Sequence, residues 1–165
     1  MTAEPITIFS PAIDPNEVIH TVRKFVSNVS VQTQDESWSE IVVSVGWPWK
    51  RKKLVLTHSP SYYSGKSWDA QMDSMRGYLS RFPDCTQKLA AIRMTENFGF
   101  AVGASFSPDC SRVDARFALV GEIVLATNGV IFTPSSLRDA FGRVLFSADY
   151  SEIDPMAVWP SYALG

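Results

Sequence analysis

The stretch WPWKRKK, residues 47–53, joins two aromatic side chains to four consecutive positive charges. Its candidate binding residues are Trp47, Trp49, Lys50, Arg51, Lys52 and Lys53. Rings that stack on bases and cations that bind phosphates suit single-stranded nucleic acid, and the same charges suit an acidic protein or an anionic membrane surface. Pro48 favours a turn, however, and alternate residues of a strand face opposite sides. We therefore favour the corner of a hairpin, and rank protein binding ahead of nucleic-acid binding among the other interpretations.

The segment PSYYSGKSW, residues 60–68, has the turn residues of a loop. Its Tyr62 and Tyr63 suit either a binding edge or a loop pinned to the core. His58 ends the apolar strand before this loop, where an imidazole can act as acid or base. A strand-end histidine that is hydrogen-bonded to the loop is the interpretation we favour.

Two cysteines, Cys85 and Cys110, stand near expected helix starts, where the helix dipole lowers the pKa of a thiol. A cysteine–histidine nucleophile with His58 is conceivable, but no spacing supports it, and we favour structural cysteines. Asp69 and Asp73 are four residues apart, and the basic residues around them indicate a solvated helix face rather than a metal site.

Motifs with an established chemistry are missing: the sequence has no GxSxG, Walker loop, HExxH or paired CxxC. We therefore assign no catalytic residue, expect no metal and no cofactor, and lean towards a protein without enzymatic activity. The alternative is an enzyme with a site centred on His58, which requires an acidic or thiol partner within hydrogen-bonding reach.

The bulk composition predicts a single folded domain of 165 residues, with 45% hydrophobic and 19% charged residues. The formal net charge of −2 argues against a dedicated nucleic-acid protein of high pI. Two cysteines make no disulfide framework, and we see neither a signal peptide nor an apolar run of membrane-spanning length. We expect a cytoplasmic protein with no membrane span.

The hydrophobic periodicity predicts alternating strands and helices. Expected strands are 5–11, 29–33, 41–45, 54–58, 98–106 and 130–134, and expected helices begin at 14, 67, 84 and 112, with a further short helix over 154–157. A tight hairpin is expected over 137–146, with Gly142 at positive φ. In the strand 98–106 one face is bulky and the other is nearly bare, and we expect the very apolar helix 112–126 to pack on the bare face.

The tripeptide FSP follows two strand ends, at residues 9–11 and 106–108, and each is followed by an acidic cap and a helix. This echo suggests two βαββ halves, 1–58 and 97–147, joined by helices over 67–95. Chance recurrence of FSP is the competing explanation.

Two longer passages, HSPSYYSGKSWDAQMDSMRGYLSRFPD and GVIFTPSSLRDAFGRVLF, resemble segments of uncharacterised bacterial proteins known only as domains of unknown function. The shared features are a YYSG–helix–RFPD block and a GVIFTP strand followed by a D-x-x-G-R hairpin. The resemblance implies a bacterial α+β domain and implies no activity.

Together these patterns predict an α+β fold with a mostly antiparallel sheet and helices packed on one side. For function we expect a non-enzymatic protein-interaction module of the adaptor or immunity type, with the WPWKRKK corner or the tyrosine loop in its surface. Nucleic-acid binding through WPWKRKK is the alternative. The sequence leaves open the oligomeric state and whether the aromatic C-terminal tail packs within the molecule.

Overall fold

The computed structural model of the chain describes residues 6–34, 37–46, 51–58, 66–108 and 114–164. Eight strands form one antiparallel sheet: β1 (Ile6–Ser10), β2 (Val29–Gln34), β3 (Ser37–Val45), β4 (Lys52–Thr57), β5 (Phe100–Ser107), β6 (Val130–Phe132), β7 (Ser136–Arg138) and β8 (Val144–Ser147). Their order across the sheet is β2-β3-β4-β5-β1-β6-β7-β8. The helices are α1 (Asn16–Phe25), α2 (Lys66–Leu79), α3 (Thr86–Asn97) and α4 (Ala115–Thr127). The predicted α+β fold with an antiparallel sheet is confirmed.

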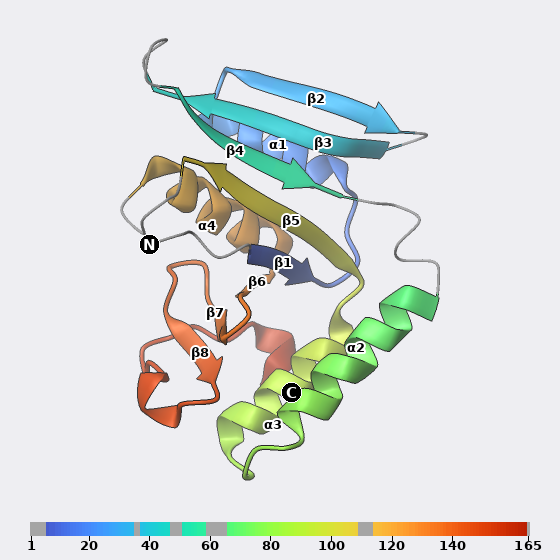
Figure 1. The fold of residues 1–165 in the computed structure, drawn as a ribbon, viewed down its shortest axis with the longest axis vertical. Helices are drawn as coiled ribbons and strands as arrows, with labels where there is room; N and C mark the ends of the chain where they lie inside the picture. The colour runs from blue at the N-terminus through green and yellow to red at the C-terminus, as the bar shows by residue number, and fades with distance from the viewer. Residues whose placement is uncertain (1–5, 35–36, 47–50, 59–65, 109–113, 165) are drawn as a thin grey trace.

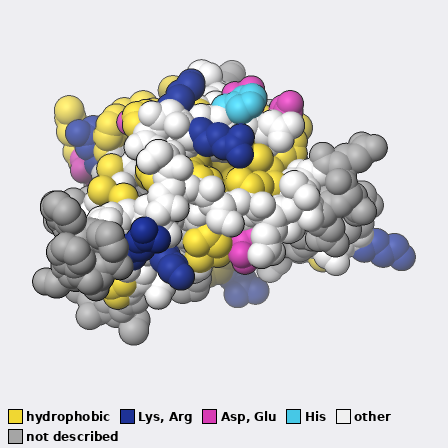
Figure 2. All heavy atoms as spheres, turned by 90° about the horizontal axis from the view of Figure 1, so that it is seen from above, with side chains coloured by type: hydrophobic (Ala, Val, Ile, Leu, Met, Phe, Trp, Pro, Cys, Tyr) yellow, Lys and Arg dark blue, Asp and Glu magenta, His cyan; other side chains and the backbone are white. Residues whose placement is uncertain are grey.

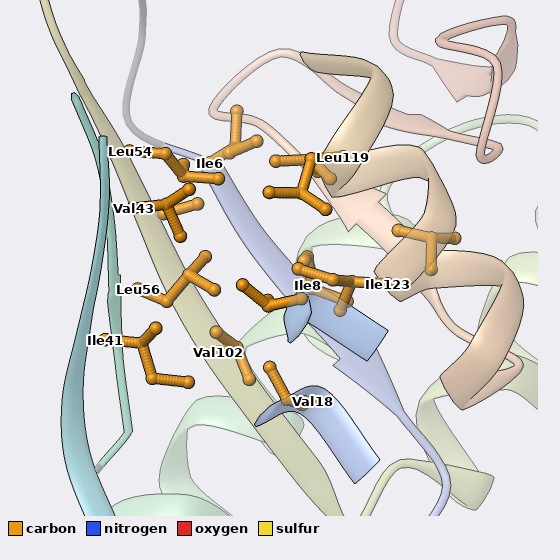
Figure 3. Packing of buried hydrophobic residues seen from close by; sticks show 14 of the residues in the cluster. Ile6, Ile8, Val18, Ile41, Val43, Leu54, Leu56, Val102, Leu119 and Ile123 are labelled. Atoms are coloured by element: carbon orange, nitrogen blue, oxygen red, sulfur yellow. The ribbon is translucent and has the colours of Figure 1, made fainter. Parts of the chain in front are cut away.

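Helices α1 and α4 cover one face of the sheet, behind the strands in Figure 1. Successive strand residues face opposite sides, and this face takes every second residue. Figure 3 shows side chains of this core: Ile6, Ile8, Ile41, Val43, Leu54, Leu56 and Val102 from the strands, Val18 from α1, and Leu119 and Ile123 from α4. Trp38 is the largest side chain fully buried there, and its indole N–H donates to Pro15 O at 2.8 Å. One-sided helix packing therefore describes α1 and α4.

Helices α2 and α3 lie on the opposite face, in a second apolar cluster. Trp68, Met72, Met75 and Leu79 of α2 are buried there together with Ala91 and Met94 of α3. Phe9 of β1 faces this cluster, while its neighbour Ile8 faces the first. The apolar side of α2 is thus in the core, but on the face opposite α1 and α4, so the helices cover both faces of the sheet and not one side only.

The bare face of β5 does not receive the apolar helix, and that prediction is wrong. α4 packs against the bulky face, with Phe100, Val102 and Ala104. On the bare face, Ala101 joins the second cluster and Ser105 is exposed. A Cβ at Gly103 would lie 2.7 Å from Thr57 Oγ1, so the missing side chain makes room for the neighbouring strand's threonine. The apolar helix buries more surface against large side chains than against small ones.

Most helix caps and turns are formed by the residue types that favour them. Asp114 is the N-cap of α4, and Asn128 ends this helix in the left-handed conformation at φ 54°. The hairpin between β7 and β8 has Gly142 at φ 79°, which confirms the predicted turn. The predicted helix over 154–157 is wrong: Ala157 N–H donates to Asp154 O in a single turn. Phe25, the last residue of α1, is 57% exposed.

The two halves share an order of elements, since β1-α1-β2-β3-β4 is matched by β5-α4-β6-β7-β8. Their strands pair differently: β4, the last strand of the first half, lies beside β5, whereas β6, the first strand after α4, lies beside β1. A duplication therefore stays a hypothesis. None of the helices in the described part of the chain is long and apolar enough to cross a membrane.

Candidate functional site

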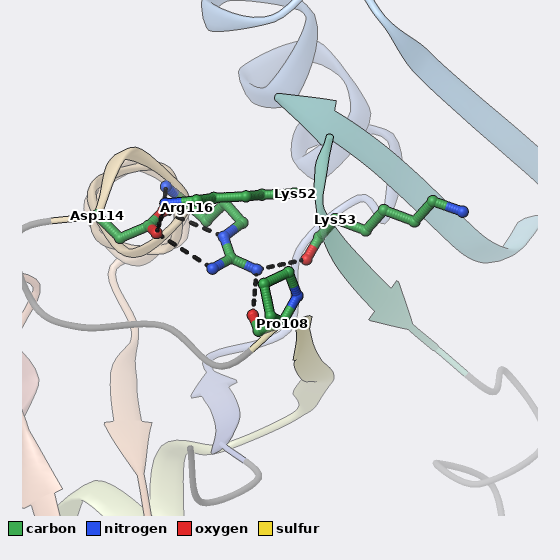
Figure 4. Close-up of polar contacts among 5 residues, drawn as sticks. All are labelled: Lys52, Lys53, Pro108, Asp114 and Arg116. Carbon is green, nitrogen blue, oxygen red and sulfur yellow. Dashed lines mark hydrogen bonds and ion pairs between the residues drawn. The ribbon is translucent and has the colours of Figure 1, made fainter. Parts of the chain in front are cut away.

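The described part of the basic stretch divides over two faces of β4. Trp47, Trp49 and Lys50 lie outside the described residues, and Arg51 is exposed just before the strand. Lys52 reaches towards α4, where its Nζ lies 3.3 Å from Asp114 Oδ2. The Lys53 side chain is exposed and points the other way (Figure 4). The alternation of strand residues thus separates neighbouring charges.

Beneath Lys52 the structure holds a buried ion pair that the sequence reasoning missed. Arg116, at the start of α4, is fully buried. Its guanidinium donates to both carboxylate oxygens of Asp114, at 3.1 Å each, and to the carbonyls of Lys53 at 3.0 Å and Pro108 at 2.6 Å (Figure 4). These bonds tie β4, the end of β5 and α4 together. The signal in the sequence was a single arginine in a mostly apolar helix.

The hydrogen bonds from Arg116 hold the pKa of the Asp114 carboxyl well below its ordinary value of 3.8, against the opposing effect of burial. The same carboxylate also accepts the Arg116 backbone N–H as the helix N-cap. These charge-assisted hydrogen bonds link the start of α4 to β4 and to the end of β5, and so stabilise the packing of the helix on the sheet.

His58 is buried against aromatic rings rather than open to solvent. Its ring centroid lies 5.1 Å from that of Trp38 and 4.8 Å from that of Phe100. Burial lowers the pKa of His58 below 6.5, and a backbone hydrogen bond with Ala101 acts in the opposite direction. A neutral ring packed in this way contributes to the core of the sheet. Tyr62 and Tyr63, and with them the loop expected to bond His58, lie outside the described residues.

Cys85 is the N-cap of α3, and its Sγ accepts the backbone N–H of Lys88 at 3.3 Å. The Lys88 ammonium is buried and donates to Phe82 O at 2.6 Å, Ser80 O at 3.3 Å and Asp84 Oδ1 at 2.9 Å. The thiol thus belongs to the corner that joins α2 to α3. Cys110 lies outside the described residues.

The carboxylate pair on α2 lies on the outside of that helix, where Asp69 and Asp73 are exposed. Asp73 accepts a 2.8 Å ion-pair contact from Arg76, in keeping with a solvated helix face.

A groove with a volume of about 410 Å³ lies between α2 and the strands β6, β7 and β8. Its walls are Gln71, Ser74, Met75, Tyr78 and Leu79 of α2, and Phe132, Thr133, Pro134, Ser135, Ser136, Leu137, Phe146, Ser147 and Ala148 of the strands and their turns. Apolar side chains supply most of this surface, and every lining side chain is uncharged. Binding pockets for small molecules commonly have this size and character.

Most polar groups of the groove are already satisfied. Thr133 Oγ1 lies 3.0 Å from Ser136 Oγ and accepts the Ser136 backbone N–H at 3.1 Å. Ser147 donates its hydroxyl to Glu152 Oε2 at 2.8 Å. The carboxamide oxygen Oε1 of Gln71 differs, because it is buried and accepts no hydrogen bond. An unpaired buried acceptor of this kind costs about 1–3 kcal/mol.

A second hollow, of about 260 Å³, lies where the end of α4, the β7–β8 turn and the C-terminal tail meet. Three large apolar side chains surround it and are mostly exposed: Leu125 (53%), Phe141 (60%) and Val158 (59%). We call these three residues the apolar patch. Arg143 stands at its edge, with its guanidinium carbon 5.4 Å from the centroid of the Phe141 ring.

The C-terminal tail packs within the molecule, which settles a question that the sequence left open. Asp139 Oδ2 accepts the Val158 N–H at 3.0 Å, and Tyr162 donates its hydroxyl to Asn128 O at 3.1 Å. Burial raises the pKa of Tyr162 to about 12. Sequence reasoning missed both the groove and the apolar patch, because each is assembled from segments far apart in the chain.

No protein-family model matches the sequence, and no curated protein and no solved structure matches it either. The resemblance to bacterial domains of unknown function therefore stays a prediction.

Proposed function

We propose that the chain is a non-enzymatic binding module for another protein, and that the apolar patch is the surface that receives the partner. The observation that carries this proposal is the grouping of Leu125, Phe141 and Val158, each more than half exposed, around one hollow. Contiguous exposed apolar surface on a folded protein commonly marks an interaction site. The hollow between the three side chains offers room for an apolar anchor residue of the partner.

The guanidinium of Arg143, at the edge of the apolar patch, favours a partner with a negative charge beside its apolar residue. Arg143 is exposed and its Nη1 donates to Met156 O at 3.0 Å, which orients the guanidinium over Phe141. Aromatic residues and arginine are the side chains that most often dominate protein–protein binding energies. A partner segment with an apolar anchor and a neighbouring carboxylate complements this arrangement.

The distribution of basic residues favours a protein over nucleic acid as the partner. Lys52 is paired with Asp114, and Lys53 points to the other face of β4. On the face seen from above, Lys and Arg side chains are scattered, with Asp and Glu between them, rather than gathered in one patch (Figure 2). Non-specific nucleic-acid binding depends on several cations that reach phosphates together.

A cytoplasmic location and a bacterial origin belong to the same proposal. The free thiol of Cys85, which serves as a helix cap, is in keeping with a reducing compartment. The adaptor or immunity role stays a proposal that rests on the same patch.

The test compares two phenylalanines of similar exposure on different surfaces: Phe141 in the apolar patch (60% exposed) and Phe25 at the end of α1 (57% exposed). Tagged wild type, Phe141→Ser and Phe25→Ser are used to capture partners from host lysate, with and without nuclease. The captured protein is then purified and its affinity for each variant measured. We expect a partner that survives nuclease, binds Phe25→Ser like wild type, and binds Phe141→Ser at least about tenfold more weakly.

Two results contradict the proposal. Partners that disappear with nuclease favour the nucleic-acid alternative. A protein partner that keeps its affinity for Phe141→Ser places the interface elsewhere on the molecule.

A further inference from the structure

We infer that the outer edge of β2 pairs with the same strand of a second copy of this chain, so that two sheets join into one across a two-fold axis. β2 ends the sheet on one side, at the top of Figure 1, and no described strand other than β3 pairs with it. An edge strand presents a row of backbone N–H and C=O groups that another strand can bind. This surface is separate from the apolar patch, and neither inference depends on the other.

The opposite edge of the sheet is closed by the chain itself. β8 has only four residues, and all four are buried. The tail after it folds back: the Asp154 N–H donates to Val144 O at 2.9 Å, and the Ser147 hydroxyl donates to Glu152 Oε2 at 2.8 Å. Within the described part of the chain, β2 receives backbone hydrogen bonds from β3 alone. It is six residues long and contains neither the lysine nor the proline that commonly protects an edge.

The register of β2 on β3 identifies the backbone groups that point outwards. The Ser44 N–H donates to Asn28 O at 3.1 Å, which makes these two residues a hydrogen-bonded pair. In an antiparallel ladder such residues alternate with residues whose N–H and C=O point away from the neighbouring strand. Counted from Asn28, the outward groups are those of Val29, Val31 and Thr33. The register shift in this ladder adds a residue to β3 and leaves β2 itself regular.

The residues of β2 are complementary to a second β2 in antiparallel orientation. A two-fold axis perpendicular to the sheet at Val31 keeps each face of the sheet continuous. Val31 then pairs with Val31 of the second copy, and Val29 pairs with Thr33. On the other face, the exposed Ser30 lies opposite the exposed Gln32. No pair brings like charges together, because β2 has no charged residue. Val29 and Val31 are only partly buried at the rim of the core, and pairing removes more of their surface from water.

Helix α1, which lies behind β2 and β3 in Figure 1, has charges that favour the same arrangement. It carries Glu17 in its first turn and Arg23 and Lys24 in its last turn, all three exposed. The same axis makes the α1 helices of the two copies antiparallel, so the acidic end of each lies at the basic end of the other. Figure 2, seen from above, shows hydrophobic side chains between charges of both signs on this side of the molecule. Self-complementarity of strand and helix favours a second copy over an unrelated strand.

The oligomeric state is measured by sedimentation equilibrium of the full chain over a range of concentrations. We expect a monomer–dimer equilibrium with a dissociation constant of about 1–100 µM, as for a small interface. Val31→Pro removes the outward N–H and keeps the bonds to β3, because an edge strand tolerates proline where its N–H would face outwards. This variant should be monomeric. Val31→Ala, which also loses side-chain packing but keeps the N–H, should still dimerise.

Two double variants at the same exposed positions test the register. Ser30→Lys with Gln32→Lys brings positive charges opposite each other across the axis, and Ser30→Glu with Gln32→Lys brings opposite charges together. Each pair occurs twice in the dimer, so the dissociation constant of the first variant should be about three- to thirtyfold higher than that of the second. The variants differ only in the charge at residue 30, and circular dichroism confirms that both are folded.

Amide hydrogen exchange followed by NMR at low and high protein concentration locates the interface. The amides of Val29, Val31 and Thr33 should exchange more slowly as the dimer forms. Those of Ser30 and Gln32 point towards β3 and should not change.

Three results would overturn the inference. A wild type that is still monomeric at about 500 µM excludes pairing with a second copy. Equal dissociation constants for the two double variants would contradict the register at Val31. A dimer that persists in Val31→Pro but dissociates in Phe141→Ser would place the interface at the apolar patch.

Discussion

The buried pair of Asp114 and Arg116 makes a quantitative prediction about stability. Arg116 has no exposed surface, and its guanidinium is neutralised by a carboxylate that also caps α4. Removing one member of a buried ion pair strands the other in a medium that solvates it poorly. The two residues should therefore depend on each other more strongly than neighbours that merely touch.

The size of each effect can be worked out from the contacts. Asp114→Ala leaves the Arg116 cation buried and unpaired, which costs about 3–5 kcal/mol. Arg116→Met removes the cation, keeps an apolar stem, and leaves the carbonyls of Lys53 and Pro108 without their donor, at about 2–5 kcal/mol. Once Arg116 is gone, Asp114→Ala removes only a helix cap and the contact with Lys52, about 1–2 kcal/mol. The coupling energy, which is the difference between these two costs of Asp114→Ala, is then about 1–4 kcal/mol.

The assay is urea unfolding of wild type, the two single variants and the double variant near pH 7, followed by circular dichroism. The double variant should be more stable than the sum of the single effects predicts, by the coupling energy. Effects that add to within about 0.5 kcal/mol would refute the interpretation of a mutually dependent buried pair.

Acid titration gives an independent measurement on the same pair, with Asp114→Asn as the matched variant. Arg116 holds the pKa of Asp114 below the 3.8 expected in the unfolded chain, so the unfolded state binds this proton first as pH falls. The stabilisation is therefore complete above that value and is lost as pH drops towards the folded-state pKa. The stability gap between wild type and Asp114→Asn should be constant near neutral pH and shrink below about pH 4. A gap that does not change in acid would contradict the mechanism.

Further predictions concern glycines and His58. Gly77 lies in α2 with open space where a Cβ would be, so Gly77→Ala should raise the free energy of unfolding by about 0.5–1 kcal/mol. Gly121→Ala in α4 places a Cβ against Ala140 O and should lower the free energy of unfolding by about 1–3 kcal/mol. Urea unfolding measures both variants, and a change of the same sign in the two would contradict the packing described for these glycines. Burial lowers the pKa of His58 below its unfolded value of 6.5, so wild type should lose stability as pH falls through that value, because the unfolded chain takes up the proton more readily. His58→Phe keeps a ring between Trp38 and Phe100 and should lack this loss; identical pH profiles of unfolding would show that His58 is not the cause.

The sequence alone determined the local structure where neighbouring residues fix it. Asp114 as a helix cap, Asn128 in the left-handed region and the turn ending at Gly142 depend only on residues a few positions away. The alternation in β4 likewise predicted that neighbouring charges would separate, and Lys52 and Lys53 do so. Composition and periodicity were also sufficient for the α+β class.

Tertiary structure decided which face of the sheet each helix covers. Periodicity showed that α2 and α4 each have an apolar side, but a pattern along one helix does not contain the identity of its neighbour. α4 packs on the bulky face of β5, whereas α2 packs on the opposite face of the sheet, in one cluster with Leu137 and Phe146 of the C-terminal hairpin. The full burial of the Arg116 side chain likewise results from the packing of α4 on the sheet, and its position in the sequence did not predict it.

Neither of the two candidate sites could be predicted from the sequence. The groove joins Gln71 to Phe132 and Phe146, and the apolar patch joins Leu125 to Phe141 and Val158. Each segment alone has an ordinary pattern of apolar and polar residues. A binding surface arises only when the chain brings the segments together, because the hollow and the exposed apolar area are properties of the packed molecule and not of any one stretch.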